Sequence, residues 1–322
     1  MPRLFPCFIG ALAEKQPFAL AILSRVKGSS PQKTGAKALF FGDGRIIGTL
    51  GGGCLEAEIQ DRARRALLTG IATSFELLLD HDFGWDDGLI CGGKVSGIIL
   101  PRAAEAASVW ERVTHAADAV TWGVRPEFSI EVSDDCNGPW LYKETVFPPT
   151  PLWIAGSGHV AQAVAPLAGQ LDFYVTVFDD RPALANHAHF PACVKFEVGS
   201  WEKILEVPSP STPAFGLIVT RGHQHDALVL RNWIQRPFAF LGMIGSRRKA
   251  RLIFNQFLEE NLATEAQIAR VFCPVGLDIA AQSVSEIAVS ICAQLIEQRA
   301  LVHAPRGSEQ LEMAAETDRV LP

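Results

Sequence analysis

A glycine-rich turn between two apolar runs constrains the fold more than any other stretch of this 322-residue chain. The stretch reads PLWIAGSGHVAQAVAPLAGQLDFYVTVFDDR over residues 151–181. An apolar run of strand length, residues 152–155, stops at the turn GSGHVA, and a helical pattern follows. A second apolar run, residues 173–178, ends at the acids Asp179 and Asp180. The order is therefore strand, glycine turn, helix, strand, acid.

Each position of this turn has a physical reason. Gly156 permits the tight turn out of the strand, Gly158 lets the backbone approach a phosphate, and the small Ala161 lets the helix pack close to the sheet. The helix start offers unpaired N–H groups and the positive end of its dipole to an anion. In such folds an acid at the tip of the next strand, here Asp179 or Asp180, accepts hydrogen bonds from a ribose hydroxyl. The pattern predicts a Rossmann-like domain, although the same glycines also suit a plain turn with another phosphate ligand, or none, above it.

Polar clusters follow most apolar runs in the second half of the chain. They are GSGH (156–159), DDR (179–181), RGHQHD (221–226), GSRRK (245–249) and GLDI (276–279). In an open parallel sheet the carboxyl ends of all strands lie at one edge, where ligands bind. We therefore expect these clusters to line one crevice of a doubly wound parallel sheet.

Two of these clusters carry candidate chemistry. The segment Gly245–Arg248 precedes a helical pattern and combines N–H groups, a hydroxyl and guanidinium groups, which suits a phosphate. His223, His225 and Asp226 are expected on a loop, either as metal ligands and proton carriers or as polar lining.

The first half contains a glycine corner that carries a cysteine. An apolar run, residues 18–24, leads into a loop, residues 25–35, that is rich in glycine, hydroxyls and cations. That loop suits an anion or a plain exposed connection equally. After a predicted hairpin, GGG at residues 51–53 precedes Cys54 and a helical pattern. Cys54 then lies in the first helical turn, where the dipole favours a thiolate, although free cysteines are often inert buried groups.

A second cysteine motif, Cys91-Gly92-Gly93, precedes a predicted strand. If the fold brings Cys54 and Cys91 together, they offer two sulfur atoms to a soft ligand, but two thiols leave a metal site incomplete. The acidic stretch before it, residues 80–88, is interpreted as a solvated loop. The seven cysteines have no CxxC spacing, which suits a reducing cytoplasm and argues against a disulfide framework.

The proline-rich segment FPPTP marks the domain boundary, because prolines stiffen a linker and exclude a helix. The expected fold is α/β, with an N-terminal mixed α/β domain followed by a Rossmann-like doubly wound parallel-sheet domain. The expected bounds are 1–147 for the first domain, 148–151 for the linker, 152–303 for the second domain and 304–322 for a flexible tail. Residues 128–132 and 139–146 are expected to form a hairpin at the end of the first domain.

Charge and hydropathy exclude two classes of protein. A net charge of −6 argues against a general nucleic-acid binder, which needs a basic face. There is no run of about 18 apolar residues, so no membrane span is expected. The first residues faintly resemble a signal peptide, but the polar residues 14–16 interrupt the apolar run, and a cytoplasmic location is expected.

Taken together, the motifs resemble the XdhC/CoxI family, the xanthine dehydrogenase accessory proteins. The matching segments, in the family's order, are GSSPQKTGAKALFFGDGRIIGTLGGGCLEAEI, CGGKV, WIAGSGHVAQAVAPLA, VTVFDDR, IVTRGHQHDALVLR, FLGMIGSRRKARLIF and PVGLDIAAQSVSEIAVSI. The resemblance covers the chain from Phe18 to about Arg299. Residues 124–149 and the tail carry little of it.

This resemblance implies a molybdenum cofactor chaperone. Such proteins bind the cofactor as molybdopterin or its cytosine dinucleotide form, protect it, assist its sulfuration by a cysteine desulfurase, and support its insertion into a molybdoenzyme of the xanthine dehydrogenase or aldehyde oxidase type. The resemblance also suggests a homodimer. It assigns no catalytic residue, and the cofactor's sulfur-accepting molybdenum gives Cys54 or Cys91 a role as protector or ligand.

The residues expected to bind the cofactor come from both domains. They are Cys54, Cys91, Gly156, Ser157, Gly158, His159, Asp179, Asp180, Arg221, His223, His225, Gly245, Ser246, Arg247 and Arg248. An alternative function is an NAD(P)-dependent oxidoreductase that uses the GSGHVA turn, and a third is an interaction scaffold with a vacant crevice.

Overall fold

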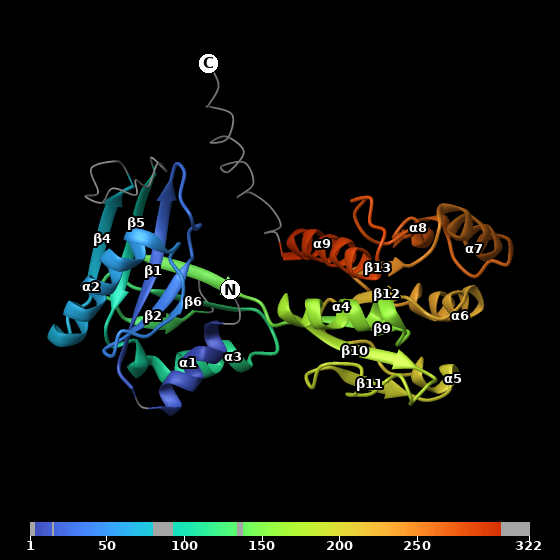
Figure 1. Ribbon diagram of the computed structural model, residues 1–322, viewed down its shortest axis with the longest axis horizontal. Coiled ribbons are helices and arrows are strands. Elements are labelled where there is room, and N and C mark those ends of the chain that lie inside the picture. The colour runs from blue at the N-terminus through green and yellow to red at the C-terminus, as the bar shows by residue number, and fades with distance from the viewer. Residues whose placement is uncertain (1–3, 15, 80–92, 134–137, 304–322) are drawn as a thin grey trace, which may run out of the picture. The chain divides into compact units, whose positions relative to one another are not determined.

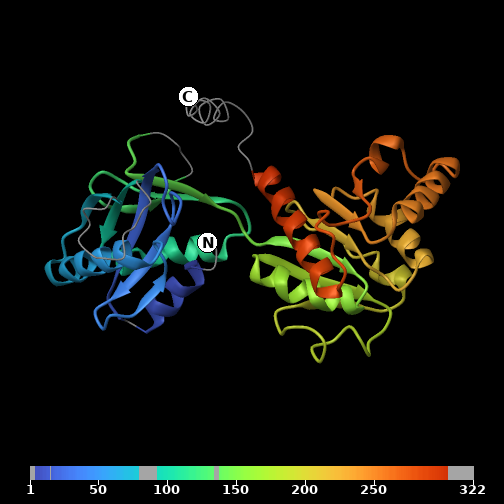
Figure 2. The ribbon, with the colours of Figure 1, turned by 45° about the horizontal axis from the view of Figure 1, so that its top comes forward.

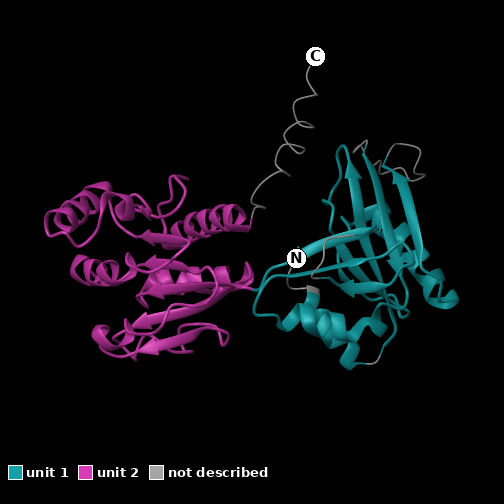
Figure 3. Ribbon diagram, turned by 180° about the vertical axis from the view of Figure 1, so that it is seen from behind, with its two compact units in different colours: residues 1–148 teal, residues 149–322 magenta. Residues whose placement is uncertain are grey.

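A computed structural model describes residues 4–14, 16–79, 93–133 and 138–303. The chain separates into two compact units, residues 1–148 and 149–322 (Figure 3). Each unit has its own hydrophobic cores. Within the described ranges, no helix has the length and apolar character that crossing a bilayer requires.

Among the described residues, the first unit has an antiparallel sheet and a smaller second sheet (Figure 1). The strands of the larger sheet are β1 (Phe18–Lys27), β2 (Lys37–Phe41), β3 (Ile46–Gly48), β4 (Thr73–Leu78) and β5 (Lys94–Leu100), in the order β3-β2-β1-β5-β4. The helices are α1 (Leu4–Ala13), α2 (Gly53–Thr69), the 3-10 helix η1 (Ala103–Ala106) and α3 (Ala107–His115). The smaller sheet contains β6 (Val120–Val124), β7 (Ile130–Val132) and β8 (Tyr142–Val146).

Both faces of the larger sheet are covered, which explains why β1 begins as an unbroken apolar run. Ala21 and Leu23 belong to a core with the α2 side chains Leu55 and Ile59. On the opposite face, Leu20 and Ile22 pack in a second core with side chains of α1, α3 and β6. Because successive side chains of a strand point to opposite faces, a strand buried on both sides loses its polar alternation.

The predicted hairpin at the end of the first unit is wrong. β7 and β8 do not pair with each other; each pairs with β6, which lies between them in the order β7-β6-β8. β6 contains Trp122 and Val124, both fully buried, and its sequence VTWGV has β-branched and aromatic residues typical of a strand. Strands that follow each other along the chain usually pair, which favours a hairpin, but burial of Trp122 makes β6 the central strand.

The second unit is built on a parallel sheet. Its strands are β9 (Thr150–Ala155), β10 (Phe173–Asp179), β11 (Lys195–Val198), β12 (Phe215–Ile218), β13 (Phe240–Met243) and β14 (Val271–Phe272), in the order β11-β10-β9-β12-β13-β14. Its helices are α4 (His159–Gln170), α5 (Trp201–Ile204), α6 (His223–Trp233), α7 (Arg247–Glu259), α8 (Glu265–Ile268) and α9 (Val284–His303). All described pairings in this sheet are parallel. The order equals 3-2-1-4-5-6, the strand order of dinucleotide-binding folds, and the expected Rossmann-like domain is confirmed.

Helices cover both faces of this sheet, as a doubly wound fold requires. α4 and α9 lie side by side over one face, where Val164 and Ile291 share a core (Figures 1 and 2). Side chains of α5, α6 and α7 form a separate core on the other face, which includes Trp233. The strand order reverses between β9 and β12, so the crevice expected for ligands starts at the carboxyl end of β9.

Three local expectations in the second unit have clear outcomes. Ser283 followed three residues later by Glu286 predicts a capping box at the start of α9. The structure confirms it, because Glu286 N donates to Ser283 Oγ at 3.2 Å and Ser283 N donates to a Glu286 oxygen at 2.9 Å. Thr150 and Pro151, expected in the linker, instead begin β9 and pair with β10. α6 begins at His223, so the histidines of RGHQHD lie in its first helical turn and not on a loop, as the sequence analysis expected.

Candidate functional site

The glycine turn after β9 has the expected local geometry. Gly156 has a φ of 111°, and a Cβ there would lie 2.4 Å from the carbonyl oxygen of Val219, so no other residue fits. Gly158 is different: nothing lies within 4 Å of the position that its Cβ would take. Gly158 also precedes α4 without any side-chain cap. The backbone at Gly158 and the first N–H groups of α4, next to exposed His159, are therefore open to an anion.

The sequence suggested that Asp179 contacts the ribose of a ligand. In the structure its side chain instead binds the glycine turn. Its buried carboxylate accepts hydrogen bonds from Ser157 N (2.7 Å) and Ser157 Oγ (2.8 Å). It also accepts from Arg181 N (2.9 Å), Nε (2.8 Å) and Nη2 (2.8 Å). These donors use the carboxylate oxygens, so little capacity is left for a ribose hydroxyl. We name this arrangement of Ser157, Asp179 and Arg181 the turn clamp.

The turn clamp keeps Asp179 ionised. Burial by itself would raise the pKa of Asp179, but hydrogen bonds from Arg181 and Ser157 outweigh burial and lower the pKa to about 2. The clamp therefore ties the glycine turn to the end of β10 with a charge-assisted network.

The second acid, Asp180, begins a polar chain at the same edge of the sheet. Arg221 Nη2 lies 2.8 Å from Asp180 Oδ2 and 3.2 Å from His225 Nε2. The His225 ring lies 6.0 Å from the ring of buried Trp201, whereas His223 is exposed. The structure thus brings Arg221, Asp180 and His225 together, as the parallel sheet predicted.

A buried pair that the sequence did not reveal lies between the ends of β12 and β13. Asp226 is fully buried and accepts a hydrogen bond from Thr220 Oγ1 at 2.7 Å and from Thr220 N at 3.1 Å. Its other oxygen pairs closely with Lys249 Nζ, which also donates to the carbonyl oxygen of Ile244 at 3.2 Å. Asp226 is thus a structural anchor for the start of α7. Its partner was not predictable because 23 residues separate the two along the chain.

Cys273 lies beside this pair. Burial raises the pKa of the Cys273 thiol to about 11; Lys249 opposes the shift and Asp226 adds to it. The thiol therefore stays protonated at neutral pH and is a poor nucleophile.

The start of α7 presents the cations that the sequence placed there. Ser246 caps the helix by accepting a hydrogen bond from Lys249 N at 3.2 Å, and a Cβ on Gly245 would crowd the Lys249 side chain. The side chains of Arg247 and Arg248 are exposed and form no hydrogen bond or ion pair within the described ranges. Their guanidinium groups are therefore available to an anion.

In the first unit, Cys54 lies in the first turn of α2, as expected, and is partly buried. Gly51, Gly52 and Gly53 before it all have positive φ values of 122°, 74° and 59°. No side chain caps the helix, and a Cβ on Gly51 would lie 2.7 Å from Pro31 Cβ. The glycine corner therefore packs against the loop of residues 28–35.

The same loop also touches the start of β5. A Cβ on Gly93 would lie 2.0 Å from the carbonyl oxygen of Ser29, so this position requires glycine. Cys91 and the acidic stretch of residues 80–88 lie outside the described residues, as does the expected tail. The predicted approach of Cys54 to Cys91 stays a prediction.

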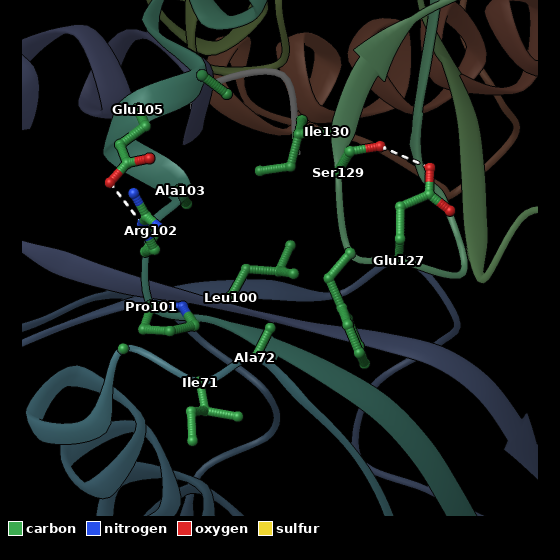
Figure 4. A pocket seen from close by; sticks show the side chains of 13 residues that line it. Ile71, Ala72, Leu100, Pro101, Arg102, Ala103, Glu105, Glu127, Ser129 and Ile130 are labelled. Carbon is green, nitrogen blue, oxygen red and sulfur yellow. Dashed lines mark hydrogen bonds and ion pairs between the residues drawn. The ribbon is translucent and has the colours of Figure 1, made fainter.

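A hollow of about 670 Å³ in the first unit was not expected from the sequence (Figure 4). Its lining comes from residues 70–72, 100–103, 105–106 and 127–130. Arg102 Nε pairs with Glu105 at 2.6 Å, and Ser129 donates to Glu127 at 3.2 Å. No local motif signals this hollow, because three separate segments form it.

The described part of the chain has no group of three His, Cys, Asp or Glu side chains suited to a metal ion. The candidate site of the second unit is an edge that offers uncapped backbone N–H groups and exposed guanidinium groups, which are groups suited to an anion.

Comparison with known proteins identifies the chain's relatives. The family described as "XdhC Rossmann domain" matches residues 152–295, and the "XdhC and CoxI family" matches residues 11–82. A protein of Bacillus subtilis (strain 168) that is named as a probable xanthine dehydrogenase subunit is 26% identical over 92% of this chain and 97% of its own length. The uncharacterized protein YqeB of Escherichia coli (strain K12) is 28% identical over 90% of this chain, which spans only 45% of that protein.

A solved structure has the same fold. The crystal structure of a xanthine dehydrogenase from Bacillus halodurans matches with a TM-score of 0.81 at 24% identity, covering 96% of this chain and 98% of that one. Two matching domain models, in the order and positions of the two units, agree with this likeness. The chain belongs to the XdhC and CoxI family.

Proposed function

We propose that this chain is an accessory protein that supports the maturation of a molybdoenzyme of the xanthine dehydrogenase or aldehyde oxidase type. In this role it binds the molybdenum cofactor, protects it, assists its sulfuration and supports its insertion. Membership of the family and the Bacillus subtilis relative named for xanthine dehydrogenase support the connection to that enzyme class.

One observation carries the choice of ligand. The acid that would hold a ribose, Asp179, is occupied by Ser157 and Arg181, whereas the open N-terminus of α4 is uncapped by any side chain. An edge with free anion-binding groups and an occupied ribose acid favours a ligand held by phosphate.

The residues present fit the phosphate of a pterin cofactor. Gly158 leaves room for close approach, and Arg247 and Arg248 offer planar donors suited to phosphate oxygens. His159, Arg221, His223 and His225 would contact the remaining polar groups. When bound, the cofactor supplies a dithiolene-held molybdenum that accepts sulfur, and we assign the Cys54 thiol and, from the sequence alone, Cys91 to its protection.

An NAD(P)-dependent oxidoreductase is the second candidate, because the strand order is that of dinucleotide-binding folds. The turn clamp argues against it, since Asp179 is saturated and Asp180 already pairs with Arg221. A dinucleotide would have to displace one of these partners.

Ligand retention separates the two candidates. The chain is co-expressed with a supply of the cofactor, purified, and the released pterin is identified and quantified. A bound pterin, with no rise in melting temperature on adding NAD or NADP, supports the accessory role. Stabilisation by NAD or NADP without any retained pterin would instead support the oxidoreductase.

Arg247 and Arg248 are tested by variants of the same helix. The double variant Arg247→Ala/Arg248→Ala should retain about tenfold less pterin, because charge-assisted hydrogen bonds to phosphate are lost. Arg251→Ala, also exposed on α7, is the matched control and should retain as much as the parent. Equal retention in all three proteins would remove α7 from the proposed site.

The thiols are tested by metal content. Cys54→Ser should lower the retained molybdenum, and Cys91→Ser is compared in parallel. Cys193→Ser is the control, since Cys193 is an exposed cysteine of the second unit. Unchanged molybdenum in both the Cys54 and Cys91 variants would exclude the thiols.

The proposed partners are a molybdoenzyme, a cysteine desulfurase and a second copy of this chain. Pull-down with each purified enzyme and light scattering of the free chain measure these associations. A monomer in light scattering would contradict the homodimer but leave cofactor binding intact.

A further inference from the structure

The end of β1 carries a group of cations that the proposed function does not use. Arg25, Lys27, Lys94, Ser96 and Glu76 line a small hollow of about 90 Å³ across β1, β5 and β4, which are adjacent in the sheet (Figure 1). Three of these side chains are cationic and one is anionic, so the hollow has a net positive charge.

A β-bulge puts these side chains on one face. The pairing of β1 with β5 shifts between Leu23 and Arg25, which leaves Ser24 as the extra residue. Leu23 points toward the core with α2, and without the shift Arg25 would point there too. The bulge turns Arg25 and Lys27 to the opposite face, which places Arg25 opposite Ser96 and Lys27 opposite Lys94.

This arrangement is unfavourable by itself. Lys27 and Lys94 are direct cross-strand partners, and like charges at such positions destabilise a sheet. Glu76 pairs with Lys94 at 2.5 Å and lies opposite Ser96. The side chains of Arg25 and Lys27 are exposed and form no hydrogen bond or ion pair in the described part of the chain, although the charge of Lys27 adds to the lowering of the pKa of Glu76. Two of the three cations therefore lack a strong partner.

We propose that this hollow is a binding site for a phosphate group, either inorganic phosphate or the phosphate of a monoester. The size agrees, because a hollow of about 90 Å³ has room for one small tetrahedral group. The charge agrees as well, since a phosphate monoester carries about −1.5 to −2 near pH 7. Arg25 supplies a planar donor pair, and the two lysines supply ammonium groups.

The site also adjoins the loop of residues 28–35, which starts directly after Lys27. Gly93 packs on Ser29 of this loop, and Gly51 packs on its Pro31. An anion between Lys27 and Lys94 would hold β1 and β5 together at the base of the loop. Binding of phosphate here does not require the molybdenum cofactor. It can be measured on lysines of the first unit, independently of the site in the second unit.

Lysine acylation measures the site locally. The full chain is treated with acetic anhydride at constant ionic strength, with chloride or with phosphate, and acylation of each lysine is followed by mass spectrometry. Phosphate should slow acylation of Lys27 about fivefold or more, as burial of its ammonium by a bound anion would. Lys143, exposed on β8, is the control and should react at the same rate in both buffers.

Variants sharpen the test. In Arg25→Ala, the phosphate concentration that protects Lys27 by half should be about tenfold higher than in the parent. This is the loss expected when a charge-assisted contact is removed. Lys27→Gln should raise the melting temperature by about 1–2 °C without phosphate, because it removes the repulsion from Lys94. When phosphate is added, the melting temperature of Lys27→Gln should rise less than that of the parent. The melting temperature of Lys143→Gln should rise as much as that of the parent.

Two ligands distinguish the source of the phosphate group. Protection by inorganic phosphate and by glycerol phosphate supports a site that accepts monoesters, and protection by inorganic phosphate alone supports a site for the free ion. Equal acylation of Lys27 with and without either compound overturns the proposal. Protection by a glutamate-rich peptide and by neither phosphate compound also overturns it, in favour of a surface for acidic proteins.

Discussion

At the scale of single residues, two glycines of one turn have different tasks. Gly156 is required by the backbone, because its φ is positive and a Cβ would collide with the Val219 carbonyl. Gly158 has an ordinary φ of −74° and open space around it, so the fold does not require it. The sequence assigned the tight turn to Gly156 and the approach of a phosphate to Gly158; the structure confirms the turn role of Gly156 and leaves the space at Gly158 open.

Exchanging the two glycines for alanine tests this separation. Gly156→Ala should lower the free energy of unfolding by about 2–4 kcal/mol, since strain and a backbone clash combine. Gly158→Ala should change it by less than about 1 kcal/mol yet reduce pterin retention, because the new methyl group occupies the approach to α4. Urea unfolding and pterin assay measure both. Equal destabilisation by the two substitutions would contradict the assignment.

The turn clamp predicts a dependence of stability on pH. The pKa of Asp179 is lowered from 3.8 to about 2, so the folded state holds its proton less tightly than the unfolded state. The clamp's contribution is therefore complete above pH about 4 and is lost as the pH falls toward 2. Asp179→Asn should lower the free energy of unfolding near pH 7 by about 2–4 kcal/mol and remove this part of the acid dependence.

Asp180→Asn is the control for the clamp. Asp180 pairs with the half-exposed Arg221, and such surface pairs contribute about 0–1 kcal/mol. Denaturant titrations at several pH values compare both variants with the parent. If Asp180→Asn lowers the free energy of unfolding as much as Asp179→Asn does, the turn clamp contributes no more than a surface ion pair.

At the scale of elements, a buried lysine joins the two sheets of the first unit. Lys37 at the start of β2 donates to the carbonyl oxygen of Gly35 (2.8 Å), to Tyr142 (3.1 Å) and to Glu144 (2.7 Å). Burial lowers the pKa of Lys37, and Glu144 opposes this shift. Glu144 also accepts a hydrogen bond from buried Trp122 at 2.8 Å. The network ties β8 and β6 to the end of the loop that packs on the Cys54 corner.

Lys37 and Glu144 should be energetically coupled. Lys37→Met should lower the free energy of unfolding by about 3 kcal/mol, because Glu144 is left without its cation. The double variant Lys37→Met/Glu144→Leu should be less destabilised than the sum of the single variants, which a double-mutant cycle measures. Arg102→Met breaks an exposed pair with Glu105 and should cost less than about 1 kcal/mol. Strict additivity would show that the pair is not coupled.

At the scale of the molecule, each unit has the cores of an independent domain. The second unit buries Trp153, Phe178 and Trp233 together on one face of its sheet, and Val164 and Ile291 lie in the core on the other. Residues 149–303 have a length within the usual range for single domains, so we expect them to fold without the first unit.

The second unit expressed alone tests this independence. Residues 149–303 should unfold cooperatively, with a near-ultraviolet circular dichroism signal from the buried Trp153 and Trp233. Residues 160–303, which lack β9 and the glycine turn, serve as the control and should not fold, because β9 is a central strand. A cooperative transition in the shorter piece, or none in the longer one, would contradict the division.

By itself, the sequence determined the order of elements in the second unit and the edge where its polar clusters gather. This was possible because the glycine turn, the apolar runs and the capping box are local patterns, and because parallel strands joined by helices place all carboxyl ends together. The same locality placed Cys54 in a helical turn.

Only the tertiary structure decided which side chains are partners. Asp179 lies against Ser157, Asp226 against Lys249, and β6 between β7 and β8, because these contacts join segments distant along the chain. The bulge at Ser24 is likewise set by pairing with β5. Such pairings depend on burial and register across strands, which a single sequence does not encode in any short pattern.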